Sequence, residues 1–324
     1  MPFTKVKFAL RQIFLGHDHK AGKVASIESA QLSCPEGLRP YLIARPSQAS
    51  ASKRPLIIIL HGSGASAAQV LGLAFPPSPL SAWLEIAERE QLLVIAPDGC
   101  KRFSERSWND GFAEIKSNPK TDDCAFISAL IDKAVEQDHA DPARVYVIGV
   151  SKGGMMAFRL ATEIAPRLAA FATVLASMPV KSNCGLPQTP LSALVIASTA
   201  DPLIPYVGGK FFYTPSFAPP MLSMETSVDI WRELAGLAGQ PVTTEFLHTD
   251  KNDPTLSTMY MWGSDPAKLQ VGLLTIAGGG HSEPSPSKRY PRLITSLVGA
   301  QSGDFETAEV AWQFFKDKRS GLSP

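Results

Sequence analysis

The sequence predicts an α/β protein in which a mostly parallel sheet carries helices on both faces. Continuous apolar runs bounded by turn residues occur at 56–60, 92–96 and 144–148, and such runs are typical of strands buried on both faces of a sheet. Stretches with helical spacing alternate with these runs. This alternation of strand and helix is the pattern of a parallel sheet that helices cover on both sides.

The expected elements follow one another along most of the chain. Strands are expected at 24–32, 38–44, 56–60, 92–96, 144–148, 169–176, 191–198 and 271–276. The first two form an antiparallel hairpin around Cys34-Pro35-Glu36-Gly37. Helices are expected at 81–88, 124–138, 154–161, 225–238 and 304–318. The stretches 100–122 and 248–268 are expected to be polar loops, and 203–223 a loop over the site.

Composition excludes two classes of protein. The chain has 31 Lys and Arg against 30 Asp and Glu, a net charge of +1, which argues against a broad electrostatic surface for nucleic acid. It contains no run of about 18 apolar residues, so we expect no membrane span.

The N-terminal stretch 8–15 is apolar but is broken by Arg11 and Gln12, and no small-residue cleavage site follows it. We interpret it as a tail or short amphipathic helix and not as a secretory signal, which predicts a cytoplasmic protein. Export by an unrecognised route is the alternative.

No C-x-x-C spacing occurs among the four cysteines, which are Cys34, Cys100, Cys124 and Cys184. We therefore expect free thiols and no zinc or redox motif.

The segment Gly149-Val150-Ser151-Lys152-Gly153 lies between the apolar run 144–148 and the expected helix 154–161. A strand, a G-x-S-x-G turn and a helix form the nucleophile elbow of an α/β-hydrolase. Glycines are needed there because neighbouring Cβ atoms would collide with the crossing strand and helix. A glycine-rich turn with an incidental serine is the alternative, so the rest of the chain must supply the partners.

Two polar residues follow later strands in the α/β-hydrolase order of Ser, Asp and His. Asp201 follows the strand 191–198, and His281 follows the strand 271–276. We expect Ser151 to be the nucleophile, His281 the base that takes its proton, and Asp201 the acid that fixes the imidazole tautomer. The alternatives are a turn that starts at Asp201-Pro202 and a loop histidine at position 281.

The backbone N–H groups of Lys152 and Ser63 are the expected oxyanion donors, and the Lys152 side chain is expected to be solvated. His61 is expected to hold the oxyanion loop by hydrogen bonds, and it is also a candidate substrate contact. Trp108 and Asn109 either line the cleft or pin the loop. This chemistry requires no metal ion.

Short motifs spread over 37–318 point to one group of proteins. They are Leu60-His61-Gly62, Pro97-Asp98-Gly99, Trp108-Asn109, Asp122-Asp123, Asp141-Pro142 with 144–146, 149–156, 201–206 and 278–281. Together they resemble the polyhydroxybutyrate depolymerase-like esterases, a group similar to the feruloyl and acetyl xylan esterases. The resemblance implies a serine esterase with no metal or organic cofactor. It also implies Ser151 as nucleophile, Asp201 as acid and His281 as base.

The chain departs from this family pattern after His281. Many relatives have Trp-Pro there, whereas this chain has Ser282-Glu283-Pro284, which removes an aromatic candidate from the cleft and adds a charge. We also recognise no polymer-binding module, so a small-molecule or oligomeric ester is favoured over an insoluble polymer.

We expect 24–324 to form a single α/β-hydrolase catalytic domain with a loop insertion around 203–268, preceded by the tail 1–23. The expected function is that of a serine carboxylesterase. The alternatives are a polyhydroxyalkanoate or feruloyl/acetyl-xylan ester depolymerase and, from another class, a non-catalytic binding protein of this fold. The sequence leaves the oligomeric state and the acyl and alcohol specificity open.

Overall fold

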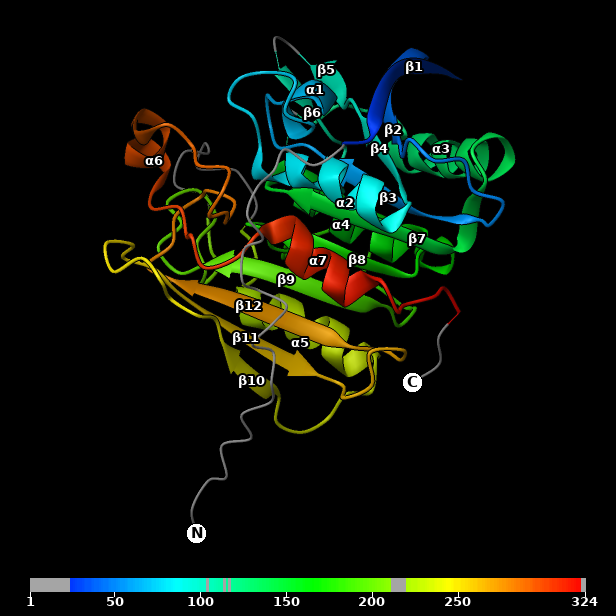
Figure 1. Cartoon of the computed structure of the whole chain (residues 1–324). Coiled ribbons are helices and arrows are strands. Elements are labelled where there is room, and N and C mark those ends of the chain that lie inside the picture. The colour runs from blue at the N-terminus through cyan, green and yellow to red at the C-terminus, as the bar shows by residue number, and fades with distance from the viewer. Residues whose placement is uncertain (1–23, 103–104, 113–114, 116–117, 211–219, 322–324) are drawn as a thin grey trace.

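A ten-stranded sheet forms the centre of the protein, with its strands in the order β1-β2-β4-β3-β7-β8-β9-β12-β11-β10 (Figure 1). The structure is a computed structural model that describes residues 24–102, 105–112, 115, 118–210 and 220–321. The stretch 8–15, expected to be a tail or short helix, lies outside these residues.

Six neighbouring strands in the middle of the sheet are parallel. They are β4 (Leu93–Pro97), β3 (Arg54–Leu60), β7 (Ala140–Val150), β8 (Ala170–Val174), β9 (Ser192–Ser198) and β12 (Val271–Ala277). Antiparallel strands flank them, with β1 (Ser26–Cys34) and β2 (Gly37–Arg45) on one side and β11 (Leu256–Trp262) and β10 (Val242–Glu245) on the other. The prediction of a mostly parallel sheet is confirmed.

Helices cover both faces of this sheet (Figure 1). One face packs against α3 (Asp123–Gln137), α4 (Lys152–Glu163) and α5 (Met224–Leu234), and the other against α1 (Ala67–Val70), α2 (Trp83–Glu90) and α7 (Thr307–Phe315). The alternation of side chains along β3 explains why one strand serves both faces. Ile58 and Leu60 belong to the core under α3 and α4, whereas Ile57 and Ile59 belong to the core under α2 and α7.

The order of the strands reverses its direction at β3. The chain passes from β3 to β4 on one side and later to β7 on the other side. Such a reversal separates the loops that leave the carboxyl ends of the strands, and ligands of open α/β sheets bind in the crevice between those loops. The loops that follow β3 and β7 begin with His61 and Ser151.

The two stretches expected to be polar loops contain regular structure, so those predictions are wrong in part. The stretch 100–122 contains a hairpin of β5 (Cys100–Arg102) and β6 (Glu105–Ser107), and 248–268 contains β11. β11 was not predicted because turn residues around 250–254 and 263–266 flank it on both sides. It pairs with β12 along its whole length. The strand β10 and the short helix α6 (Arg292–Val298) were also not predicted from the sequence.

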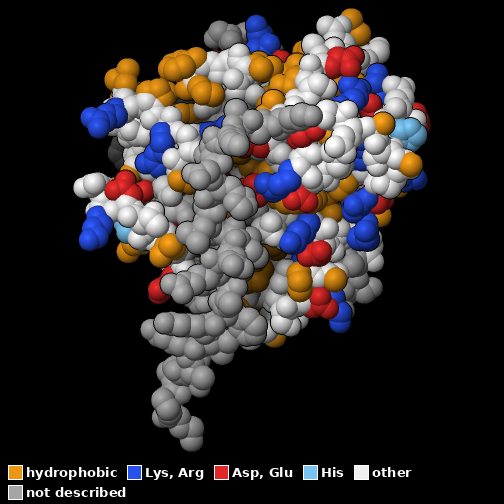
Figure 2. Space-filling view, in the orientation of Figure 1, with side chains coloured by type: hydrophobic (Ala, Val, Ile, Leu, Met, Phe, Trp, Pro, Cys, Tyr) orange, Lys and Arg blue, Asp and Glu red, His pale blue; other side chains and the backbone are white. Residues whose placement is uncertain are grey.

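The surface mixes positive and negative side chains on the face shown in Figure 2. Apolar side chains gather at the corner where α6 lies, and Leu293 and Leu297 of α6 are 75% and 73% exposed. None of the helices in the described part of the chain is long and apolar enough to cross a membrane.

Candidate active site

Ser151 lies at the sharp turn between β7 and α4, as the G-x-S-x-G motif predicts. Its backbone has φ 53° and ψ −119°, a conformation that residues with a Cβ rarely adopt. The turn lifts the side chain out of the sheet and places it at the first turn of α4. This strain is typical of functional sites, where the surrounding packing holds it in place.

The glycines around Ser151 are required by close packing. A Cβ added to Gly149 would lie 2.1 Å from the carbonyl oxygen of Gly153. One added to Gly153 would lie 2.1 Å from the carbonyl oxygen of Leu60 in β3, and one added to Gly154 would lie 2.6 Å from the Cβ of Ala176. The helix therefore approaches the sheet more closely than any larger residue would permit.

A chain of hydrogen bonds joins the three residues predicted from different strand ends. The Nε2 atom of His281 lies 2.9 Å from the Oγ atom of Ser151, and the Nδ1 atom lies 2.6 Å from Oδ2 of Asp201. In the neutral imidazole, Nδ1–H donates to the carboxylate and Nε2 accepts from the hydroxyl. This arrangement can take a proton from a serine hydroxyl and return it to a leaving group.

Asp201 is held so that one carboxylate oxygen faces His281. Its Oδ1 atom accepts hydrogen bonds from the backbone N–H groups of Leu203 and Ile204, both at 2.8 Å. The side chains of Asp201 and His281 are 1% and 11% exposed. A carboxylate so buried needs these donors, and together they fix its orientation toward the imidazole.

The backbone of His281 is fixed by a tight crossing of two loops. The N–H group of His281 donates to the carbonyl of Val298 at 2.6 Å, and that of Gly280 donates to the carbonyl of Ala300 at 2.8 Å. A Cβ on Gly280 would lie 2.3 Å from the Cα of Gly299. The glycine before His281 therefore permits a backbone contact that holds the histidine at the end of β12.

The two expected oxyanion donors lie on the two loops that frame Ser151. Lys152 is the first residue of α4, where an N–H group has no carbonyl partner within its own helix. Ser63 is exposed in the turn after β3. The ideal Cβ position of the neighbouring Gly62 lies 3.6 Å from the Cβ of Ser151, so this turn packs directly against the serine.

His61 is a buried support of this turn. Its Nδ1–H donates to the carbonyl of Gly62 at 2.7 Å, and its Nε2 accepts the N–H of Gly99 at 2.9 Å. Burial lowers the pKa of His61 to about 4, so the ring is neutral near pH 7. The Trp108 indole donates to the carbonyl of His61 at 2.9 Å. Both side chains are 0% exposed, which favours the interpretation of His61 and Trp108 as supports of the loop over that of substrate contacts.

Asn109 pins the loop that follows Trp108. Its N–H donates to Oδ2 of Asp123 at 2.7 Å, and its side-chain amide donates to the carbonyl of Thr121 at 3.0 Å. Its carbonyl accepts from the Arg159 guanidinium at 2.5 Å. Of the two interpretations of Asn109, these contacts favour a structural one.

The Lys152 side chain is not solvated, so that expectation was wrong. Its ammonium lies 2.6 Å from Oδ2 of Asp110 and donates to Oδ1 of Asn118, also at 2.6 Å. The side chains of Lys152 and Asp110 are 11% and 0% exposed. A carboxylate buried on the loop requires a cation, and Lys152 supplies it. Asp110 and Asn118 were not predicted from the sequence because neither belongs to a motif.

The sequence suggested that Glu283 adds a charge to the cleft, and the structure contradicts this. Its side chain is buried, and it accepts hydrogen bonds from Ser78 and Tyr290.

All four cysteines are free thiols. Within the described ranges, no group of three or more His, Cys, Asp or Glu side chains is placed to hold a metal ion.

Comparison with known proteins adds relatives that are named as esterases. The chain is 28% identical to NocK of Nocardia uniformis subsp. tsuyamanensis, named as an esterase, over 81% of this chain and 74% of NocK. It is 27% identical to feruloyl esterase C of Emericella nidulans, over 72% of this chain and 79% of that protein. It is 25% identical to feruloyl esterase B of Piromyces equi, of which it spans only 43%. No protein-family model matches the chain.

A solved structure shares the fold. The acetyl xylan esterase from Aspergillus awamori superposes with a TM-score of 0.53 at 15% identity, over 79% of this chain and 94% of that one. The chain therefore has the α/β-hydrolase fold. Its relatives are named as esterases, feruloyl esterases among them, which confirms the resemblance seen in the sequence.

Proposed function

We propose that this protein hydrolyses carboxylic esters through an acyl-enzyme formed on Ser151. The observation that carries the proposal is the hydrogen-bonded chain from Ser151 through His281 to Asp201. The relatives named as esterases support the same chemistry.

The first half of the proposed reaction forms the acyl-enzyme. His281 Nε2 takes the proton of the Ser151 hydroxyl while Oγ attacks the ester carbonyl. The N–H groups of Lys152 and Ser63 bind the oxyanion of the tetrahedral intermediate. His281 then gives its proton to the leaving alcohol as the C–O bond breaks. Asp201 stabilises the imidazolium while it exists.

The second half releases the acid. Water gives a proton to His281 and attacks the acyl carbonyl, the second tetrahedral intermediate forms in the same oxyanion site, and the proton returns to Ser151 as the acid leaves. The cycle uses only ester and water, so the chain's own residues carry every proton transfer.

The proposed substrate is a small-molecule or oligomeric ester. Feruloyl and acetyl esters are the first to test, because relatives and the structural neighbour carry these groups in their names. A polyhydroxyalkanoate depolymerase is the alternative within the same chemistry. A non-catalytic binding protein is the alternative from another class, and an intact chain of Ser, His and Asp disfavours it.

A panel of p-nitrophenyl esters from acetate to long acyl chains tests the proposal, with feruloyl esters, acetylated xylan and hydroxybutyrate oligomers alongside. We expect turnover that disappears in S151A. The acyl length with the highest kcat/KM then reports the depth of the acyl site. Equal inactivity of the folded wild type and S151A on every ester would contradict the proposal.

A further inference from the structure

The loop that follows His281 is attached to the rest of the protein through a buried carboxylate. Glu283 is only 5% exposed, two residues after His281. Its Oε1 accepts a hydrogen bond from the hydroxyl of Ser78 at 2.8 Å, and its Oε2 accepts one from the hydroxyl of Tyr290 at 2.6 Å. Ser78 belongs to the segment 71–85 and Tyr290 to the loop 281–301, so this carboxylate joins the two.

The loop 281–301 is also cross-linked within itself. The side chain of Gln301, 3% exposed, donates to the carbonyl of Glu283 at 2.8 Å and accepts the N–H of Tyr290 at 2.8 Å. The backbone of the loop returns beside its start, where Gly280 donates to Ala300. A displacement of Glu283 would therefore move the backbone that carries His281.

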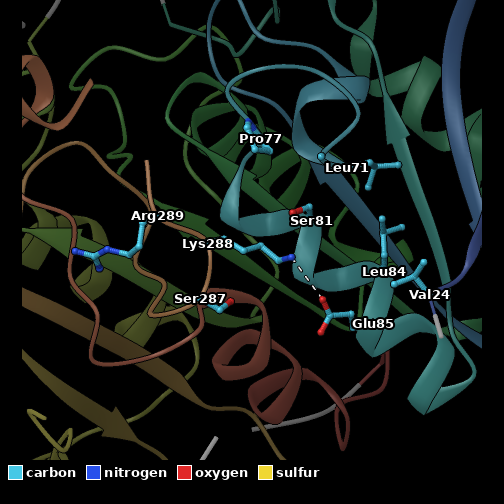
Figure 3. A pocket seen from close by; sticks show the side chains of 10 residues that line it. Val24, Leu71, Pro77, Ser81, Leu84, Glu85, Ser287, Lys288 and Arg289 are labelled. Carbon is cyan, nitrogen blue, oxygen red and sulfur yellow. Dashed lines mark hydrogen bonds and ion pairs between the residues drawn. The ribbon is translucent and has the colours of Figure 1, made fainter. Parts of the chain in front are cut away.

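Beside this carboxylate, the loop and the segment 71–85 face each other across a cavity. A cavity of about 440 Å³ separates them, with Leu71 and Leu84 on one wall and Ser287 on the other (Figure 3). One ion pair spans this cavity, between Lys288 Nζ and Glu85 Oε1 at 3.5 Å, with side chains 30% and 44% exposed. Exposed pairs of this kind contribute little to stability, so the buried Glu283 is the stronger link.

The two hydrogen bonds that Glu283 accepts satisfy both of its side-chain oxygens. A buried carboxylate is costly unless donors satisfy both oxygens, and here Ser78 and Tyr290 each supply one. Burial, together with the neighbouring carboxylate, raises the pKa of Tyr290, so its hydroxyl retains the proton that it donates. Loss of the carboxylate would leave both hydroxyls without this acceptor.

We propose that Glu283 is a positioning residue, which holds the loop 281–301 against Ser78 and thereby sets the position of His281 relative to Ser151. The inference rests on the proposed function. Proton transfer requires the base within hydrogen-bond reach of the hydroxyl, so a small shift of the imidazole lowers kcat and leaves substrate binding nearly unchanged. Glu283 itself does not contact Ser151 or the proposed oxyanion donors.

Three variants and one control test this role. E283A removes the carboxylate, E283Q keeps its shape and one acceptor oxygen, and Y290F removes one donor. E85Q is the control, because Glu85 lies on the same interface but in an exposed pair. Each variant is assayed for kcat and KM on p-nitrophenyl acetate, for its melting temperature, and for the low-field proton NMR signal of the His281 Nδ1–H bound to Asp201.

We expect E283A to lower kcat by about tenfold or more with KM changed by less than about twofold, and to weaken or shift the Nδ1–H signal. E283Q should recover much of the loss, Y290F should lie between E283Q and E283A, and E85Q should match the wild type. E283A or Y290F that melts earlier but keeps both the wild-type kcat and the wild-type signal would overturn the proposal. A wild type with no ester turnover would refute the proposed function, and the Nδ1–H signal would still decide whether Glu283 positions His281.

Discussion

Ser151 has a strained backbone, and its side chain is hydrogen-bonded to His281. Its φ of 53° costs about 1–3 kcal/mol, and the close packing of Gly149 and Gly153 against the helix and β3 maintains it. The hydroxyl then meets His281, whose other nitrogen is held by Asp201. The serine can thus be activated without a rearrangement of the backbone.

The proposed role of Asp201 predicts the effect of one isosteric change. D201N keeps the volume of the side chain but removes the charge that holds His281 in the reactive tautomer, so kcat should fall by about ten-thousandfold. Steady-state kinetics on the best p-nitrophenyl ester would measure this. D229N is the matched control, because Asp229 pairs with Arg232 on the surface of α5 with its side chain 48% exposed. Near-wild-type turnover in D201N would mean that another group fixes the histidine.

Sequence order identified the three residues that the structure brings together, because each follows a strand and the carboxyl ends of parallel strands meet. The burial of the other side chains near the site could not be predicted in the same way. Lys152 looked solvated until the fold placed Asp110 beside it. For Trp108 the sequence left open whether the side chain lines the cleft or pins the loop, and the packing of the loop buries it. Contacts between residues far apart in sequence decide these cases, and no local pattern encodes them.

The turn 149–153 between β7 and α4 positions Ser151. Substitution of its glycines tests whether close packing holds this turn in place. In an ordinary helix, replacing Gly by Ala stabilises by about 0.5–1 kcal/mol. G153A should instead destabilise by about 3 kcal/mol, because its Cβ would meet the backbone of Leu60 at 2.1 Å and that backbone belongs to a central strand.

Chemical denaturation of G153A and G62A would measure this difference. Gly62 is the control because it also lies beside Ser151, yet a Cβ there would make only ordinary contacts at 3.6 Å. Equal stability of G153A and the wild type would mean that α4 is free to move away from β3.

Continuous apolar runs in the sequence predicted the buried strands, whereas elements that are only partly buried or exposed were not predicted. In β11 most residues are only partly buried, and turn residues flank the strand on both sides. In α6 no residue is buried, so the helix has no apolar stripe directed at the core to reveal it. The sheet edge and the His281 loop therefore depend on pairing and tertiary contacts.

Across the whole molecule, the C-terminal segment closes the apolar face opposite α4. Phe315 of α7 stacks on Tyr146 of β7 at 5.0 Å, and the Tyr146 hydroxyl donates to the carbonyl of Lys318 at 2.8 Å. The Lys318 side chain is fully buried, and its ammonium donates to the carbonyl of Pro266 and to Oε1 of Gln270. No carboxylate in the described part of the chain forms an ion pair with this ammonium.

Because the Lys318 side chain is buried, we expect the stability of the protein to depend on pH. Burial lowers its pKa from 10.5 to about 8, so between these values the unfolded chain binds a proton that the folded protein does not. The free energy of unfolding should therefore rise with pH across this window, and below pH 8 the contribution is constant.

Urea denaturation from pH 7 to pH 10.5 would compare the wild type with K318M. The unfolding free energy of the wild type minus that of K318M should increase by about 3 kcal/mol from pH 8 to pH 10.5. K316M is the control, since Lys316 is exposed and lies two residues before Lys318, directly after α7. A difference that stays constant with pH would show that Lys318 titrates normally.

Mass spectrometry of the trapped protein would show directly whether Ser151 forms the covalent intermediate. The wild type, S151A and H281A would be treated with a fluorophosphonate and digested, and the modified peptide would be mapped. We predict one adduct, on Ser151, which is fast in the wild type, much slower in H281A and missing in S151A. An unmodified Ser151 in folded wild-type protein, or an adduct on another residue, would contradict the account.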